Sequence, residues 1–258
     1  MHKIETAQGI TVSYDRQGSG PPLVLVHGAF SDHRSNWEFV LPFLTTRFTT
    51  YAVARRGRGQ TQATVGHTVE DESLDVASLI EAVGVPVFLL GHSYGAPVAL
   101  RAAALVPERV RKLVLYEPPW PHLLNGTVLG VLRQYAQAGQ WREFSAWFFE
   151  NVLRVPPADV AALQATELWD PIQDDAPATW HDLSALGRYD FAPRRFQELA
   201  MPVLLQAGSE SPQDLWATDA LAAVLPDVRL GVLDGQAHEA MTTAPEAYAA
   251  AVIEFLVR

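Results

Sequence analysis

The chain has 258 residues, 48% hydrophobic and 19% charged, which suits one sizeable domain with a buried core and excludes a disordered chain. Its formal net charge of −10 argues against nucleic acid or an anionic membrane as the main partner. The absence of cysteine excludes disulfides and thiolate chemistry. Without a signal-peptide-like start, or an apolar run of about 20 residues, we expect a cytoplasmic protein with no membrane span.

Up to residue 117, segments typical of strands alternate with segments typical of helices. The apolar run Leu23–Val26 predicts a buried strand, and residues 68–83 have the apolar spacing of an amphipathic helix that Thr68 can cap. In chain order we expect strands at 10–14, 23–26, 48–53, 87–90 and 113–116, and helices at 35–44, 68–83 and 96–106. This alternation implies a mostly parallel sheet that is covered by helices on both faces.

The alternation stops after residue 117. Residues 118–189 show no strand pattern, contain helical segments at 128–138 and 141–153, and hold five of the seven tryptophans. Strand patterns return at 203–206 and 228–233, and a last helix is expected at 245–257. We therefore expect an α/β core of residues 1–117 and 190–258, interrupted by a helical insertion of residues 118–189.

The motif Gly91-His92-Ser93-Tyr94-Gly95 stands between a predicted strand and a predicted helix. A Gly-x-Ser-x-Gly pattern at such a junction is typical of a nucleophilic serine, because the turn is so sharp that larger side chains at its two flanks would collide. The turn lifts Ser93 Oγ clear of the backbone and directs the Tyr94 amide at a developing oxyanion. The alternative is that Ser93 only caps the following helix.

With this motif the sequence resembles the α/β-hydrolase superfamily over nearly the whole chain. His27-Gly28-Ala29-Phe30 is similar to the family's His-Gly turn, which implies an oxyanion hole formed by the amides of Ala29 and Tyr94. Asp234-Gly235-Gln236-Ala237-His238 matches the family's Gly-x-x-His pattern and implies that His238 is the general base. The insertion corresponds to the family's helical cap.

One loop departs from the family pattern. Arg55-Arg56-Gly57-Arg58-Gly59 resembles the family's D-x-R/P-G-x-G loop, but Ala54 stands where the aspartate is usual. In the family that aspartate mostly supports loops, so the catalytic residues are not affected by its loss. We expect the three arginines to lie in a solvated turn.

The third catalytic residue has several candidates. In the family it usually follows the strand predicted at 203–206, but that position holds Ser211, with Glu210 one residue earlier and Asp214 three residues later. Some branches of the superfamily instead carry a catalytic glutamate at the end of the preceding strand, where this chain has Glu117. We favour Glu117, with Glu210 as its rival and Asp214 as the third choice.

The resemblance implies a serine hydrolase that cleaves an ester or lactone of a small, largely apolar substrate through an acyl-enzyme on Ser93. No cofactor is implied, and no His/Asp/Glu set has the sequence spacing of a metal site. The side chains expected to wall the substrate pocket are Phe30, Trp120, Trp147 and Phe148. The alternatives are a cofactor-free perhydrolase or haloperoxidase, a carbon–carbon hydrolase, and a ligand-binding protein on a hydrolase scaffold.

Overall fold

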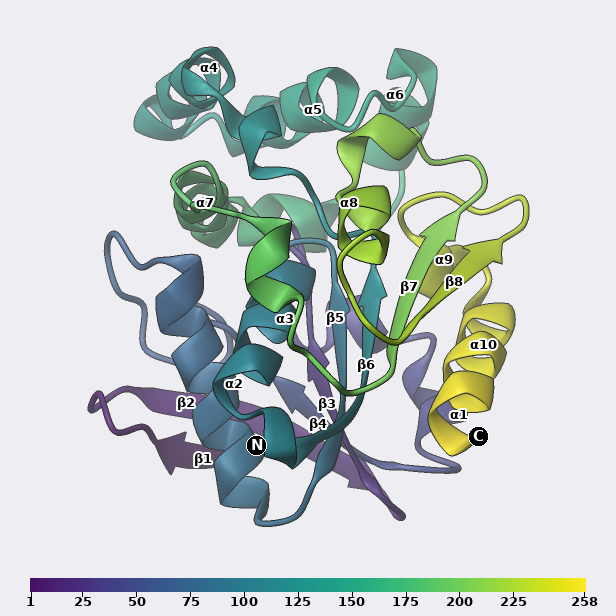
Figure 1. Ribbon diagram of the computed structural model, residues 1–258. Coiled ribbons are helices and arrows are strands. Elements are labelled where there is room, and N and C mark those ends of the chain that lie inside the picture. The colour runs from purple at the N-terminus through teal and green to yellow at the C-terminus, as the bar shows by residue number, and fades with distance from the viewer.

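The computed structural model describes residues 1–258 and is built around one eight-stranded sheet (Figure 1). Its strand order is β1-β2-β4-β3-β5-β6-β7-β8. β1 pairs antiparallel with β2 and β2 with β4, while every other pair is parallel, as predicted. The strands are β1 (His2–Glu5), β2 (Thr11–Gly18), β3 (Pro22–Val26), β4 (Thr49–Val53), β5 (Val87–His92), β6 (Val110–Tyr116), β7 (Val203–Gly208) and β8 (Val228–Leu233).

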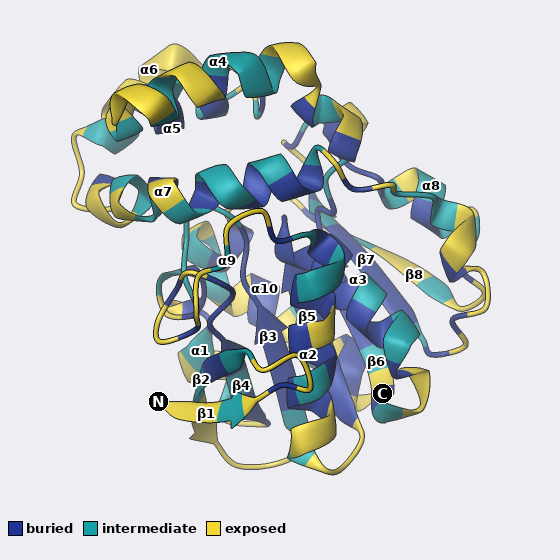
Figure 2. Cartoon of the chain, turned by 90° about the vertical axis from the view of Figure 1, so that its left-hand side faces the viewer, coloured by how far each residue is buried: buried dark blue, intermediate teal, exposed yellow.

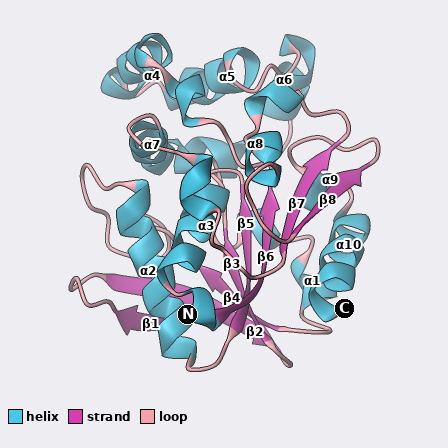
Figure 3. Cartoon of the chain, in the orientation of Figure 1, coloured by secondary structure: helices cyan, strands magenta, loops and turns pink.

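Helices cover both faces of this sheet, so the sheet is the middle of three layers (Figure 3). α2 (Val69–Val83) and α3 (Gly95–Leu105) pack on one face, and α1 (Leu41–Leu44) and α10 (Pro245–Val257) pack on the other. Side chains of strand β3 pack on both faces of the sheet, because successive side chains of a strand point in opposite directions. Leu23 and Leu25 belong to the cluster with α10, while Val24 and Val26 belong to the cluster with α2 and α3.

Local sequence signals account for where two of these helices begin. Thr68 caps α2 through its side chain, which accepts a hydrogen bond from the Asp71 amide, and the Asp71 carboxylate accepts one from the Thr68 amide. The helix predicted at 35–44 is wrong in extent, since only a 3₁₀ turn (Ser35–Trp37) and the short α1 form there. Pro42 explains this break, because proline is tolerated only in the first turn of a helix.

Residues 126–186 form a helical layer over the carboxyl ends of the central strands (Figure 1, Figure 2). Its helices are α4 (Gly126–Ala138), α5 (Trp141–Asn151), α6 (Pro157–Gln164) and α7 (Trp169–Leu186). Side chains such as Phe144, Phe148 and Leu183 join the hydrophobic cluster of the sheet below. The lower edge of this layer is therefore continuous with the core, and the division into core and cap stays a prediction.

The remaining elements are short and lie in the connections between the longer strands and helices. They are the 3₁₀ turns Pro107–Arg109, Pro121–Leu124, Pro193–Phe196 and Gln213–Leu215, with α8 (Thr218–Ala222) and α9 (Ala240–Thr243). No helix combines the length and the apolar character needed to cross a bilayer.

Candidate active site

Ser93 lies on a sharp turn between β5 and α3. Its φ of 51° is in the left-handed region, which costs a non-glycine residue about 1 kcal/mol or more. A Cβ on Gly91 would lie 2.5 Å from the carbonyl oxygen of Gly95, and one on Gly95 would lie 2.2 Å from that of Val26. Both flanks must therefore be glycine, which is the steric reason for the Gly-x-Ser-x-Gly spacing.

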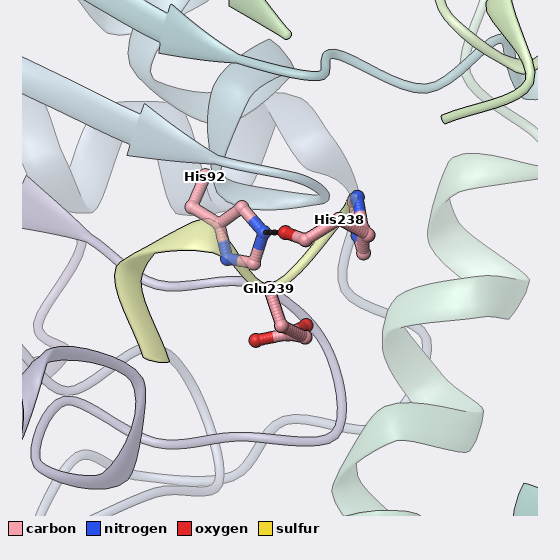
Figure 4. Close-up of side chains that lie close together, drawn as sticks. All are labelled: His92, His238 and Glu239. Carbon is pink, nitrogen blue, oxygen red and sulfur yellow. Dashed lines mark hydrogen bonds between the residues drawn. The ribbon is translucent and has the colours of Figure 1, made fainter. Parts of the chain in front are cut away.

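His238 faces Ser93 from the loop between β8 and α9. Its Nε2 lies 2.9 Å from Ser93 Oγ. The imidazole stacks on the indole of Trp216, with ring centroids 4.7 Å apart and planes 4° from parallel. The backbone beneath it is also held, because His92 Nε2 lies 3.2 Å from the carbonyl oxygen of His238 (Figure 4). The ring and its loop are thus fixed from two sides.

Glu117 is the carboxylate that reaches His238. Its Oε2 lies 2.6 Å from His238 Nδ1, and its Oε1 accepts a hydrogen bond of 2.9 Å from the Gly208 amide. Glu117 follows β6 with a φ of 48° and is completely buried. Gly208 also lets the loop that carries His238 approach closely, since a Cβ there would lie 2.1 Å from the carbonyl oxygen of Gln236.

The two rival carboxylates lie away from His238. Glu210 is exposed, and its side chain has one hydrogen bond, 3.2 Å from Ser209 Oγ. Asp214 is also exposed and forms an ion pair of 2.6 Å with Arg154. Of the three candidates from the sequence, the fold brings only Glu117 together with His238.

The charge of Glu117 sets the protonation behaviour of the site. Burial lowers the pKa of His238, but the hydrogen bond to Glu117 and the negative charge of Glu117 outweigh burial, so the net pKa lies above the ordinary value for histidine. The neighbouring His92 has no such carboxylate. Burial, helped by the positive charge of a protonated His238, holds the pKa of His92 well below the ordinary value. Of the two neighbouring imidazoles, only His238 therefore has a raised pKa and a direct contact with Ser93.

The two residues predicted to form the oxyanion hole, Ala29 and Tyr94, both line the cavity that contains Ser93. Neither the Ala29 nor the Tyr94 amide has a hydrogen-bond acceptor within the protein. On the far side of the Gly28–Ala29 peptide, the Gly28 carbonyl oxygen accepts hydrogen bonds of 2.8 Å from both Arg55 Nη2 and His27 Nδ1. Because the C=O and N–H of a trans peptide point in opposite directions, these two contacts aim the Ala29 amide away from Arg55.

The expectation of a solvated arginine turn is wrong. Arg55, Arg56 and Arg58 are each exposed by 5% or less. Arg56 pairs with Asp75 at 2.6 Å, and Arg55 with Glu72 at 3.1 Å. These partners lie on α2, distant from the arginines in sequence, so the local motif gave no indication of them.

Arg55 joins the helical layer to the turn that carries Ala29, and Arg58 shares its acidic partner on that layer. Asp182 of α7 is completely buried. Its carboxylate accepts a hydrogen bond of 2.6 Å from Arg55 and lies 2.7 Å from the guanidinium of Arg58. Burial raises the pKa of Asp182, but the two guanidinium groups outweigh it and hold that pKa well below the ordinary value. One turn earlier on α7, Thr179 Oγ1 accepts a hydrogen bond of 2.7 Å from the Phe30 amide.

A cavity of about 370 Å³ lies between the helical layer and the core, with Ser93 and His238 in its wall. The predicted pocket residues Phe30, Trp120 and Phe148 line it, and so do the Ala29 and Tyr94 residues. Trp147 does not, which corrects its place in the predicted pocket. It is partly buried and packs against the hydrophobic cluster, because adjacent positions of a helix face different directions.

The fold gathers two sets of three potential metal ligands that sequence spacing did not indicate. They are His67, Glu72 and Asp182, and His92, His238 and Glu239 (Figure 4), each with ligand atoms within 4.8 Å. In the first set, both carboxylates already bind Arg55. In the second set, the two His238 nitrogens face Ser93 and Glu117. In each set, protein hydrogen bonds thus already engage some of the atoms that a metal would need.

Sequence reasoning missed Trp216, Arg55 and Asn36 as parts of the site. Asn36 Oδ1 accepts a hydrogen bond of 2.9 Å from the Gly28 amide and so holds the same turn as Arg55. Trp216 and Asn36 lie outside every motif, and Arg55 lies in a loop that was expected to be solvated. All three reach the site because the segments that carry them meet at one edge of the sheet.

Comparison with known proteins agrees with this architecture. A family model described as the alpha/beta hydrolase family matches residues 23–251. The chain is 28% identical to 2-(acetamidomethylene)succinate hydrolase of Mesorhizobium japonicum, over 96% of this chain and 92% of that protein. It is 26% identical to N-formylmaleamate deformylase of Pseudomonas putida, over 90% and 88% of the two chains.

The same likeness extends to solved structures. An alpha/beta hydrolase from Sphaerobacter thermophilus is similar with a TM-score of 0.86 and 30% identity, over 99% of this chain and all of that one. Together with the sequence relatives, this structure indicates a hydrolase. With the family match covering most of its length, the chain belongs to the alpha/beta hydrolase family.

Proposed function

We propose that this protein is a serine hydrolase that cleaves a carboxylic ester or lactone of a small, largely apolar substrate. One observation carries the proposal: Ser93, His238 and Glu117 form a continuous hydrogen-bonded row at the wall of an apolar cavity. This is the arrangement in which a serine is activated by a base that a carboxylate orients. No cofactor or metal takes part in the proposed reaction, and the enzyme is proposed to act in the cytoplasm.

In the proposed mechanism, Ser93 Oγ attacks the carbonyl carbon while His238 Nε2 takes its proton. The amides of Ala29 and Tyr94 donate hydrogen bonds to the oxyanion, and each such donor typically contributes about 10²–10³ in rate. His238 then gives the proton to the departing alcohol, leaving an acyl-enzyme. A water molecule, deprotonated by His238, attacks that acyl group and releases the acid with Ser93 restored. Glu117 stabilises the imidazolium that forms in each step.

Labelling with a fluorophosphonate tests the nucleophile. We expect the parent protein to be labelled, and Ser93→Ala to lose both labelling and ester hydrolysis. Ser35→Ala is the matched control, because Ser35 also lines the cavity but lies outside the proposed row. Intact-protein mass spectrometry reads the adduct. Equal labelling of the parent and Ser93→Ala would contradict the proposal. No labelling of either protein would favour the ligand-binding alternative.

The pH dependence should report His238. Only the neutral imidazole accepts the Ser93 proton, and the pKa of His238 is raised, so kcat/KM should fall with decreasing pH from a point above about 6.5, the ordinary histidine value. Glu117→Gln removes the charge that raises the pKa, so the inflection should move to lower pH. The measurement is a kcat/KM profile for both proteins. A parent profile that is flat down to pH 5 would rule out a histidine base.

A second candidate reaction is amide hydrolysis, and the names of two relatives favour it. The deformylase and the (acetamidomethylene)succinate hydrolase are named for substrates with an acyl group on nitrogen. The same row of residues serves that reaction if His238 protonates a departing amine. Matched ester and anilide substrates separate the two, and a higher kcat/KM for the anilide would replace the ester proposal. Perhydrolysis and carbon–carbon cleavage remain further alternatives on the same residues.

A further inference from the structure

The cavity beside Ser93 has two unlike sides. Every lining residue that comes from residues 119–186 is apolar, so the helical layer forms an apolar roof. All the polar lining side chains come from the core below. An acyl chain on Ser93 that extends under the roof would meet only hydrocarbon and aromatic rings, such as those of Phe148 and Leu183.

The cavity also carries no cation for a substrate. Neither arginine nor lysine lines it, and its two carboxylates are Glu38 and Glu239. Both glutamates are exposed residues, which places them at the mouth of the cavity. The lining charge is therefore negative whenever His238 is neutral.

The buried cation behind Tyr94 is already paired with acidic side chains. The Arg55 guanidinium lies 4.4 Å from the centre of the Tyr94 ring, and Tyr94 lines the cavity. Arg55 is bound on its other sides by Glu72 and Asp182, and it is 3% exposed. It is covered by the Tyr94 ring and paired twice, so it is not available to bind a substrate carboxylate.

We propose that the cavity selects uncharged, apolar acyl groups and rejects acyl groups that carry a carboxylate. The inference rests on the proposed hydrolase function and names its substrate class. A carboxylate held against the roof would lose its water, gain no cation from the cavity, and find no side-chain hydrogen-bond donor on the roof side, which is strongly unfavourable. Glu38 and Glu239 at the mouth also repel a negatively charged substrate as it approaches. Salt screens this repulsion.

Two esters that differ at one end of the acyl chain test the inference. 4-Nitrophenyl hexanoate ends in a methyl group, and the mono-4-nitrophenyl ester of adipic acid carries a carboxylate there. They share the leaving group and the length of the carbon chain. We expect kcat/KM for the hexanoate to exceed that for the adipate by about 10²-fold or more. A ratio within about threefold of unity would overturn the inference while leaving the hydrolase function intact.

Substitutions in the cavity wall separate two effects: the loss of water by a substrate carboxylate under the roof, and its repulsion by the glutamates at the mouth. Ile172→Arg places a cation at the edge of the roof, where Ile172 is only partly buried, and should lower the hexanoate-to-adipate ratio about tenfold or more. Ile172→Gln is the matched control, since it adds polarity without charge, and should change the ratio much less. Glu38→Gln should lower it only slightly, and only at low salt. An unchanged ratio in Ile172→Arg, with the fold verified by circular dichroism, would contradict the inference.

The outcome also distinguishes a failure of the inference from a failure of the proposed function. Fluorophosphonate labelling of Ser93 with no turnover of the hexanoate overturns the apolar-acyl inference alone. Loss of both labelling and turnover overturns the hydrolase proposal and this inference with it.

Discussion

Glu117→Gln is expected to lower kcat for an activated ester by about 10³–10⁴-fold, while Glu210→Gln leaves it within a few-fold of the parent value. Glutamine keeps the size of the side chain and an oxygen that can accept from the Gly208 amide. It removes the negative charge that lies 2.6 Å from His238 Nδ1. The imidazolium formed when Ser93 is deprotonated then has no counter-charge.

Glu210→Gln is a matched control because it makes the same chemical change on an exposed loop. Initial rates with 4-nitrophenyl hexanoate give kcat and KM for both variants. KM should change little in either, since neither carboxylate lines the cavity. A large loss of kcat confined to Glu210→Gln would show that the wrong carboxylate has been assigned.

The second large effect concerns stability. Asp182→Asn is expected to lower the free energy of unfolding by about 3–5 kcal/mol, because removing one partner of a buried ion pair leaves uncompensated charge. Asp182 is completely buried between Arg55 and Arg58, at 2.6 Å and 2.7 Å. The amide keeps the shape of the side chain but not its charge, and the two guanidinium groups retain only Glu72 and Asp175 as acidic partners.

Asp214→Asn provides the comparison for this effect. Asp214 and Arg154 also pair at 2.6 Å, but their side chains are 64% and 51% exposed. Water screens such a pair, so its loss should cost less than about 1 kcal/mol. Urea unfolding of the parent and both variants measures the difference, with the slope checked for constancy. Equal destabilisation by the two substitutions would show that burial of the Asp182 network does not matter.

Features set by neighbouring residues could be predicted from the sequence. The tight turn at Ser93 depends on Gly91 and Gly95, which lie within two positions of it, and the start of α2 depends on Thr68. The mostly parallel sheet followed from the alternation of segments and is confirmed. His238 as base and Glu117 as acid came from a family resemblance, and the contacts of 2.9 Å and 2.6 Å support both proposals.

Features that depend on distant residues could not be predicted. Three arginines in five residues suggested an exposed turn, because nothing nearby in the sequence pairs with them. Asp182, which binds Arg55, lies 127 positions later in the chain. The error over Trp147 has a similar origin. Its helix was expected, but the way α5 packs on α4 and α7 decides which of its side chains face the cavity. The residue type at position 147 does not indicate this packing.

The link between α7 and the turn of Ala29 has a consequence for how this fold can diversify. The segment that shapes the pocket also contributes Asp182 and Thr179, which hold Arg55 and the Phe30 amide. Exchanging the helical segment with that of a relative would therefore alter the support of the chemistry together with the choice of substrate. In this chain the substrate pocket and the support of the catalytic residues are not independent modules. New specificities would have to arise by replacing roof side chains one at a time while α7 keeps its polar contacts to the core.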